Sequence, residues 1–268
     1  MGNFYIFLTA VLWSTSGVLI KFINGSAIAI NALRSLIAFL FLAVSQKSWH
    51  IRLGKTIVAA ALCLTFTNLF YVMAVKLTSA ANAITLQYLA PLFVLIWDSI
   101  YQRRLPGFQK LICIAVAFGG MVLFFYDSLG KGYLLGNLLA VAAGLCFSGV
   151  FFLNSLPNSS AADASKLAFL LSFVIGLPYI GQFAYGEPDS VWALLFLGIF
   201  QVGLAYHLYA KGCQLTSPLN ASLISLLEIV LNPLWVYLFF KETISPLSLL
   251  GAVVIVAAVV ANAVLERK

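Results

Sequence analysis

Long apolar stretches separated by short polar connections make up most of this sequence. Ten such segments can be drawn, at roughly residues 3–22, 27–46, 55–76, 80–101, 108–126, 132–154, 164–184, 189–211, 217–240 and 246–265. A helix rises ~1.5 Å per residue, so each segment is long enough to cross a hydrocarbon layer of ~30 Å. A transmembrane barrel would instead show strands of ~10 residues with alternating polarity. The pattern predicts an all-α membrane protein with ten transmembrane helices.

The composition agrees with this pattern and excludes a soluble protein. Of the 268 residues, 63% are hydrophobic and only 9% are charged, which is too little polar surface for a water-soluble domain of this size. The net charge of +7 would suggest nucleic acid in a soluble protein, but in a membrane protein it is better explained by topology. We therefore expect a lipid bilayer as the partner and no nucleic acid.

The basic residues are divided unequally between the two sides of the expected bundle. With both chain ends on one side, that side carries ten: Lys47, Arg52, Lys55, Arg103, Arg104, Lys110, Lys166, Lys211, Arg267 and Lys268. The other side carries four, Lys21, Lys76, Lys131 and Lys241, and Arg34 lies inside the second segment. Because cytoplasmic loops are enriched in Lys and Arg, this predicts a multi-pass protein of the cell (inner) membrane with both termini cytoplasmic.

An internal repeat divides the chain into two halves. Residues 77–83, LTSAANA, match residues 215–221, LTSPLNA, at an offset of 138 that also pairs Tyr71 with Tyr209 and Trp97 with Trp235. The halves are residues 1–127 and 128–268, each with five expected spans. Because five is odd, the second half should be inserted upside down relative to the first. Inverted repeats of this kind place a substrate site at their interface, near the middle of the membrane.

Glu228 is the one acidic residue expected at membrane depth. A charge there costs ~2.5–3.5 kcal/mol or more, so it should face a cavity or a partner. Residues 217–240 are expected to form a helix, and helical spacing places Ser225, Asn232 and Trp235 on the same face as Glu228. We therefore predict that these four residues contact substrate, with Glu228 as a counter-charge for an amine or as a protonation switch.

Several other polar or aromatic residues are expected inside the membrane. Trp13 lies at mid-depth, unlike an interfacial Trp, and Gln87 needs partners for its amide. In the third span Asn68 and Tyr71 share a face, and their repeat equivalents are Tyr206 and Tyr209. All six are predicted to contact substrate, although interhelical hydrogen bonding is the alternative for the pairs. Arg34 is expected to act in structure or gating, and Tyr88 is expected on a different face from Gln87.

The sequence shows no enzymatic or cofactor signature. The four cysteines have no metal-binding or Cys-x-x-Cys spacing, and no phosphate-binding loop of the Walker type occurs. We therefore expect no enzyme activity, cofactor, metal or ATP hydrolysis. The fifth and tenth segments carry almost no polar atoms, which favours an outer scaffold or a homodimer contact.

Motifs along the whole chain resemble those of one transporter family. They include Trp13 in AVLWSTSGVLIK, Arg34 in NALRSLIAFLF, Pro91 in QYLAPLF, Glu228 in LLEIV, and the following KETIS. The chain resembles the drug/metabolite transporter superfamily in its EamA-like branch. The resemblance implies ten helices in an inverted five-plus-five arrangement around a central cavity, with alternating access. One position departs from the family, because Ile229 stands where proline usually follows the acid, and Pro233 is expected to distort the helix instead.

Three functional classes follow from these observations. The first is a secondary transporter, in particular an exporter, of small polar metabolites such as amino acids. Its alternative cargo is an organic cation or quaternary amine held by an aromatic cage and Glu228. A non-transporting membrane scaffold or sensor is the alternative from another class, and a membrane-embedded enzyme is the third.

Overall fold

The computed structural model describes residues 1–15, 19, 22–78, 80–126, 134–240 and 245–266, and these are almost entirely helical. The elements are α1 (Gly2–Ser14), α3 (Ala27–Ser45), α4 (Lys55–Leu77), α5 (Ala80–Gln87), α6 (Ala90–Gln102), α7 (Phe108–Phe125), α8 (Leu134–Ser155), α9 (Ala161–Gly176), η2 (Leu177–Gln182), α10 (Pro188–Phe196), η3 (Leu197–Leu204), α11 (Ala205–Gly212), α12 (Pro218–Ser225), α13 (Leu227–Phe240) and α14 (Pro246–Leu265). Within the described ranges, the one β-type contact is an isolated bridge between Gly25 and Phe183. The expected all-α class is thus confirmed.

Eight helical segments of the described chain are long and apolar enough to cross a membrane. Two further apolar helices, Gly2–Ser14 and Pro218–Leu231, are shorter than a full span. The structure therefore supports a multi-span membrane protein and confirms eight of the ten expected spans by length and composition. The two short helices fall in the first and ninth predicted segments.

Two predicted spans are interrupted where they were expected to be continuous. The helix expected at residues 80–101 is divided into α5 and α6 at Tyr88 and Leu89, and the helix expected at 217–240 is divided at Leu226. In the first case Pro91 has no N–H to donate to the Gln87 carbonyl one turn earlier. In the second case the Leu226 and Ile229 amides donate three residues back, each at 3.0 Å, which tightens the turn. The interruption thus lies at Leu226, upstream of Pro233, where the sequence predicted a distortion of the helix.

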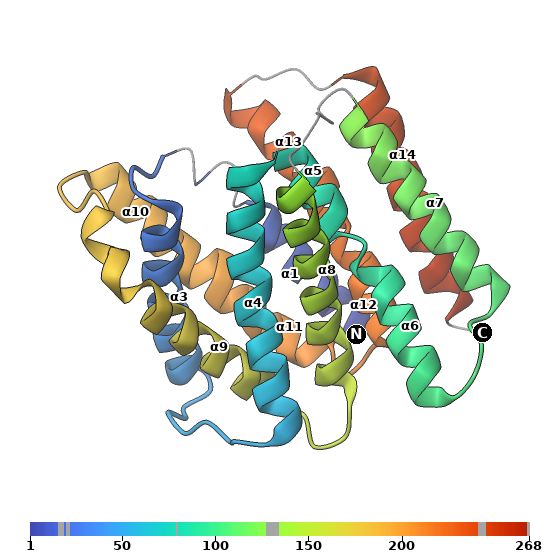
Figure 1. Ribbon diagram of the computed structural model, residues 1–268, viewed down its shortest axis with the longest axis horizontal. Coiled ribbons are helices and arrows are strands. Elements are labelled where there is room, and N and C mark those ends of the chain that lie inside the picture. Colours follow the sequence, from blue (N-terminus) through green and yellow to red (C-terminus); the bar gives the residue numbers. More distant parts are fainter. Residues whose placement is uncertain (16–18, 20–21, 79, 127–133, 241–244, 267–268) are drawn as a thin grey trace.

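The helices pack in a pattern that relates the two halves of the chain. α8 lies against α4, α5 and α6, while α1 lies against α11, α12 and α13 (Figure 1). α7 and α14 form a separate pair at one edge of the molecule (Figure 1). Their contact is close because both contribute glycine: a Cβ on Gly251 would lie 2.4 Å from the backbone nitrogen of Phe124. Because α7 and α14 lie at the edge, the interior of the molecule is formed by the other helices.

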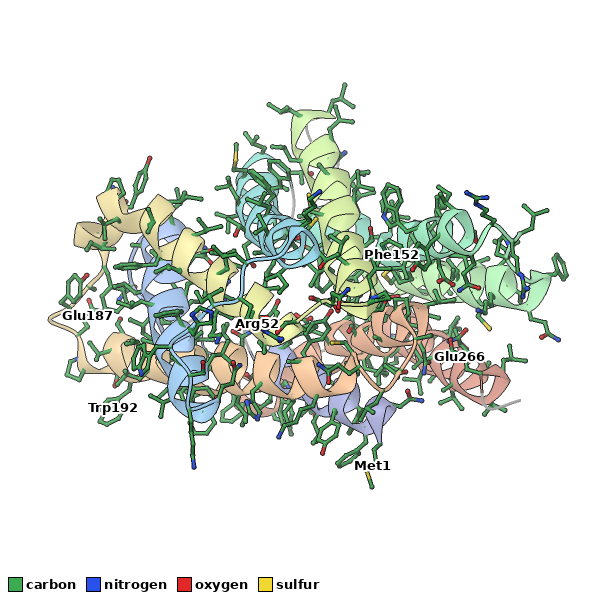
Figure 2. The ribbon with its side chains drawn as sticks, turned by 90° about the horizontal axis from the view of Figure 1, so that it is seen from below. Met1, Arg52, Phe152, Glu187, Trp192 and Glu266 are labelled. Carbon is green, nitrogen blue, oxygen red and sulfur yellow. The ribbon has the colours of Figure 1, made fainter. Side chains whose placement is uncertain are left out.

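Both ends of the described chain lie on one side of the molecule, here called the terminal side (lower half of Figure 1). The Ser217 hydroxyl donates a hydrogen bond to Glu266. Arg52 from the α3–α4 loop is also on this side (Figure 2) and pairs with Asp163 at 2.9 Å, as buried Lys166 does at 3.0 Å. Two of the basic residues that the sequence placed on one side are therefore held together by the same carboxylate.

The repeated sequence motif forms two equivalent hydrogen-bonded clusters. Thr78 donates to Asn137 Oδ1 at 2.9 Å, and Asn82 donates to Thr78 at 3.2 Å. At the repeat-equivalent positions, Thr216 donates to Asn3 Oδ1 at 2.6 Å and Asn220 donates to Thr216 at 3.1 Å. In each cluster the motif ties the start of a short helix to the beginning of a helix from the other half.

The paired tryptophans make a second set of equivalent contacts. Trp97 donates from Nε1 to the Ser148 hydroxyl of α8 at 3.0 Å, and Trp235 donates to the Ser14 hydroxyl of α1 at 2.8 Å. Each half therefore gives one indole to the first helix of the other half.

Candidate substrate-binding site

A central cavity of ≈ 430 Å³ lies among the helices of both halves. Its wall includes Glu228, Tyr88 and Trp13 in the interior, and it extends to Ile23 and Gly25 in the segment that precedes α3. That segment lies on the side opposite the chain ends. The other lining residues are Ala27, Ile30, Asn31, Arg34, Ser35, Thr67, Asn68, Tyr71, Val72, Ile84, Gln87, Phe147, Phe169, Gln201, Val202 and Tyr206.

Glu228 reaches this cavity because the interruption at Leu226 puts it in the first turn of α13. Its Oε2 accepts a hydrogen bond of 2.5 Å from the Tyr88 hydroxyl. Tyr88 itself is buried at the interruption between α5 and α6. Both partners therefore sit at the equivalent breaks in the two halves, and a hydrogen bond to a carboxylate is among the strong ones in proteins.

A positive charge lines the same cavity. Arg34 on α3 donates from Nη2 to Asn31 Oδ1 at 2.9 Å and from Nε to the same oxygen at 3.2 Å. The ion pairs of the described chain do not join Arg34 to Glu228, although both line the wall. The cavity thus carries one group of each sign, and neither is neutralised by the other at contact distance.

Aromatic rings form a continuous part of the wall. The ring of Trp13 lies 5.2 Å from that of Tyr206 and 6.0 Å from that of Phe147. Tyr206 also meets Phe169 edge to face at 5.0 Å, and Tyr88 meets Phe147 at 6.1 Å. Rings at these distances pack favourably and present apolar faces to a solute.

Two glutamine side chains in the wall keep unused acceptors. The Oε1 atoms of Gln87 and Gln201 are buried without a hydrogen-bond partner, while Gln201 Nε2 donates to the Trp13 carbonyl at 3.4 Å. Gln87 ends α5 at its interruption, and Gln201 lies in the π-helical stretch η3. Irregular helix of this kind is common at functional sites, and a polar solute or water can satisfy both oxygens.

Six of the ten residues predicted to contact substrate line the cavity: Trp13, Asn68, Tyr71, Gln87, Tyr206 and Glu228. Three others are engaged elsewhere. Tyr209 is fully buried and donates to the Val150 carbonyl at 3.2 Å, Ser225 donates to the Ala221 carbonyl at 2.9 Å, and Trp235 is bonded to Ser14. The side chain of Asn232 lies outside the described residues.

The predicted polar face is interrupted between Ser225 and Glu228, whereas Glu228 and Trp235 lie on one continuous helix. The break at Leu226 separates Ser225 on α12 from Glu228 on α13. Tyr88, which the sequence placed on a different face from Gln87, is a wall residue, and so is Arg34. The proline at position 91 was the signal that a break, and therefore a change of face, comes before it.

The described residues offer no other reactive centre in this region. No three His, Cys, Asp or Glu side chains gather to hold a metal ion among them. The four cysteines are free thiols. The arrangement is thus suited to recognising a solute by charge, hydrogen bonds and ring contacts.

Comparisons with known proteins agree on one family. The sequence model of the EamA-like transporter family matches residues 1–126 and 134–264. An uncharacterized transporter of Archaeoglobus fulgidus is 25% identical over 96% of this chain and 94% of its own length. The threonine/homoserine exporter RhtA of Escherichia coli K12 is 24% identical over 89% of this chain and 82% of its own.

A solved crystal structure has the same fold. It superposes with a TM-score of 0.85 over 99% of this chain and 97% of its own, at 18% sequence identity. At that identity the likeness concerns the fold alone.

Proposed function

Because this chain belongs to the EamA-like transporter family, we propose that it is a secondary transporter that carries small zwitterionic metabolites, amino acids in particular, through the central cavity. The observation that carries this proposal is the presence of Arg34 and Glu228 in the wall of one cavity. An amino acid carries an ammonium group that matches Glu228 and a carboxylate that matches the planar guanidinium of Arg34.

The remaining wall suits the rest of such a solute. The rings of Trp13, Tyr206 and Phe147 can contact an apolar side chain, and the unused oxygens of Gln87 and Gln201 can accept from the ammonium group. The cavity volume of ≈ 430 Å³ falls in the range of small-molecule sites, ~300–1,000 Å³. A buried charge without its counter-charge is costly, so an empty cavity is expected to hold water and a filled one a solute of matching charges.

A second cargo class is favoured by one specific feature, the rings near Glu228. An organic cation in this cavity would gain cation–π attraction of ~0.5–2 kcal/mol per well-placed ring. Arg34 would repel it, whereas a zwitterion is attracted by both charges. The two classes therefore differ in what they require of Arg34.

We propose that the protein lies in the inner membrane with both chain ends in the cytoplasm. It would export its solute by alternating access between two inverted halves. The export direction is suggested by the similarity to RhtA, a threonine/homoserine exporter. The two family matches flank the expected boundary at residue 127, and the reciprocal Trp–Ser and Thr–Asn bonds are what an inverted repeat would produce. Coupling to protons, exchange or a gradient of the solute would each be compatible with this cycle.

The test is counterflow of radiolabelled solutes into proteoliposomes, with threonine and homoserine first and then a panel of amino acids and quaternary amines. For a zwitterion, Glu228→Gln and Arg34→Gln should each lower transport at least about tenfold, the equivalent of ~1.4 kcal/mol. For an organic cation, only Glu228→Gln should do so, and Arg34→Gln should leave transport unchanged or raise it.

A matched control is Arg52→Gln, which removes an arginine that is mostly exposed on the terminal side and outside the cavity. It should retain transport of every active solute. Unchanged counterflow in both cavity variants, with a solute that the parent protein transports, would overturn the proposed site.

A further inference from the structure

A second cavity of ≈ 520 Å³ opens on the terminal side, here called the vestibule. It is bounded by the end of α6, the end of α8 and the α11–α12 connection, with Asp98, Asn154 and Gln214 among its polar residues. Asn154 is only 3% exposed, and its Oδ1 has no hydrogen-bond partner. A buried polar atom of this kind needs a water molecule or a solute to bind it.

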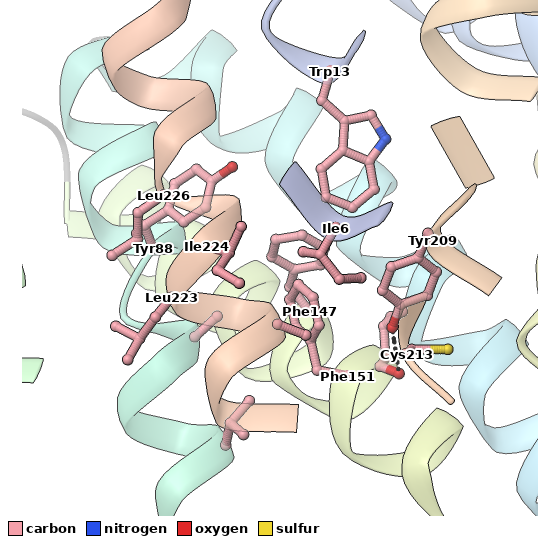
Figure 3. Packing of buried hydrophobic residues seen from close by; sticks show 14 of the residues in the cluster. Ile6, Trp13, Tyr88, Phe147, Phe151, Tyr209, Cys213, Leu223, Ile224 and Leu226 are labelled. Atoms are coloured by element: carbon pink, nitrogen blue, oxygen red, sulfur yellow. Dashed lines mark hydrogen bonds between the residues drawn. The ribbon is translucent and has the colours of Figure 1, made fainter. Parts of the chain in front are cut away.

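Two aromatic residues, Tyr209 and Phe151, here called the barrier pair, lie between wall residues of the central cavity and wall residues of the vestibule. Both are fully buried, and their rings meet edge to face at 5.7 Å (Figure 3). On the side of the central cavity, Tyr209 contacts the wall residues Trp13 at 6.1 Å and Tyr206 at 5.8 Å. The barrier pair therefore packs directly behind ring residues of that cavity's wall, without lining the cavity itself.

On its other side the barrier pair meets the vestibule. Cys213 and Asn154, which line the vestibule, follow Tyr209 and Val150 by one helical turn. The Tyr209 hydroxyl donates to the Val150 carbonyl at 3.2 Å, which holds the ring of α11 against α8 (Figure 3). A carbonyl inside a helix already accepts its intrahelical bond, so when this additional bond breaks only the Tyr209 hydroxyl must find a new partner.

We infer that the central cavity and the vestibule are successive stations of one solute path, and that the barrier pair is the closed gate between them. The inference rests on the proposed transport function, which it extends by naming the gate and the second station. In the vestibule, Asp98 and the free oxygen of Asn154 are acceptors, and they suit the ammonium end of the same solute. Opening requires Tyr209 to leave Val150, and movement of α11 relative to α8 would achieve this.

The test measures solvent access and needs no substrate. In a background with Cys63, Cys113, Cys146 and Cys213 replaced by alanine, Ile84→Cys reports on the central cavity and Gln214→Cys on the vestibule. A charged, membrane-impermeant methanethiosulfonate is applied in proteoliposomes to the side that carries a C-terminal tag. When Tyr209 and Phe151 are unchanged, the cysteine at position 214 should react from this side, and the cysteine at position 84 should react slowly.

Removing the barrier should expose the central cavity to the terminal side. Tyr209→Ala should accelerate labelling at position 84 at least about tenfold, and Tyr209→Phe, which keeps the ring and loses one hydrogen bond, about fivefold. Phe124→Ala is the matched control, because it deletes a buried ring beside α14, away from both cavities. It should leave the rate unchanged.

Three results would overturn the gate. They are an unchanged rate at position 84 in both Tyr209 variants, an equal acceleration in the Phe124 variant, or no reaction at position 214 from the tagged side. Because labelling does not depend on cargo, each of these would leave the counterflow test of the proposed function standing. If no solute of the panel shows counterflow but the labelling results are as expected, the proposed cargo is rejected and the proposed gate stands.

Discussion

At the scale of single residues, the most informative contact is the hydrogen bond from Tyr88 to Glu228. It fixes one carboxylate oxygen at 2.5 Å from a phenol that comes from the other half of the chain. Arg34 is held in a similar way by Asn31, so both charges of the cavity wall are oriented by neutral neighbours. Such orientation lowers the entropy cost of binding, because the charged groups need not be ordered by the solute.

Tyr88→Phe tests this orientation. The variant keeps the ring packing against Phe147 and removes the donor to Glu228. A hydrogen bond to a charged group is worth ~1.5–3 kcal/mol, and water in the cavity should replace part of it, so we expect solute affinity to fall about three- to tenfold. The measurement is solute-induced thermal stabilisation of purified protein in detergent.

Tyr126→Phe serves as the control, since Tyr126 is exposed at the end of α7 and should not affect binding. Equal affinity in Tyr88→Phe and the parent protein would show that Glu228 does not need its phenol partner.

At the scale of elements, the site residues gather where helices depart from regularity. Gln87 and Tyr88 lie at the α5–α6 interruption, Glu228 follows the break at Leu226, and Gln201 lies in η3. Irregular backbone inside a membrane protein is tolerated only where it is buried in protein or lines a cavity. The interruptions are therefore both the reason that these side chains reach the cavity and a sign that the region is shielded from lipid.

Gly144→Ala tests how the first interruption is supported. A Cβ at this position in α8 would lie 2.5 Å from the Gln87 carbonyl oxygen, the carbonyl that Pro91 leaves without its helical donor. We expect overpacking of ~1–3 kcal/mol and a lower Tm in detergent. Gly119→Ala is the matched control, because no atom lies within 4 Å of its added Cβ. Equal Tm values in the two variants would contradict close packing at the break.

The sequence predicted the helical class, and six of its ten candidate residues, Glu228 among them, line the cavity, because polar groups in apolar segments are few and costly. It misplaced Tyr88 and Ser225, because assigning faces assumed that each span is one continuous helix. Trp235 lies on the same helix as Glu228, but its indole donates to Ser14 of α1, a contact that the sequence does not show. The break at Leu226 has no proline at the equivalent of Pro91, so only tertiary contacts reveal it. Tyr209 shows a different limit of sequence-based prediction. Its place in the repeat indicates how deeply it is buried, but not where it lies relative to the two cavities.

At the scale of the whole molecule, the equivalent contacts connect the two halves. The Thr78 and Thr216 clusters occupy equivalent positions in the repeat, and each uses an asparagine near the beginning of a helix from the other half. The same exchange occurs for Trp97 and Trp235. α7 and α14 contribute no residue to the central cavity, so their role as an outer scaffold or homodimer contact stays a prediction.

An inverted repeat makes one strict prediction about sidedness: equivalent loops must lie on opposite sides of the membrane. Gly107 and Ser245, which are related by the offset of 138, precede α7 and α14 respectively. In the cysteine-free background, Gly107→Cys should react with an impermeant thiol reagent from the side of a C-terminal tag, and Ser245→Cys only from the opposite side. Gly107 has open space around it. Ser245→Cys keeps the size of the side chain but weakens the helix cap that Ser245 makes with the Ser248 amide, at a cost of ~1 kcal/mol that does not change the side on which the loop lies. Reaction of both cysteines from the same side would exclude the inverted arrangement, and with it the proposed alternating access between two inverted halves.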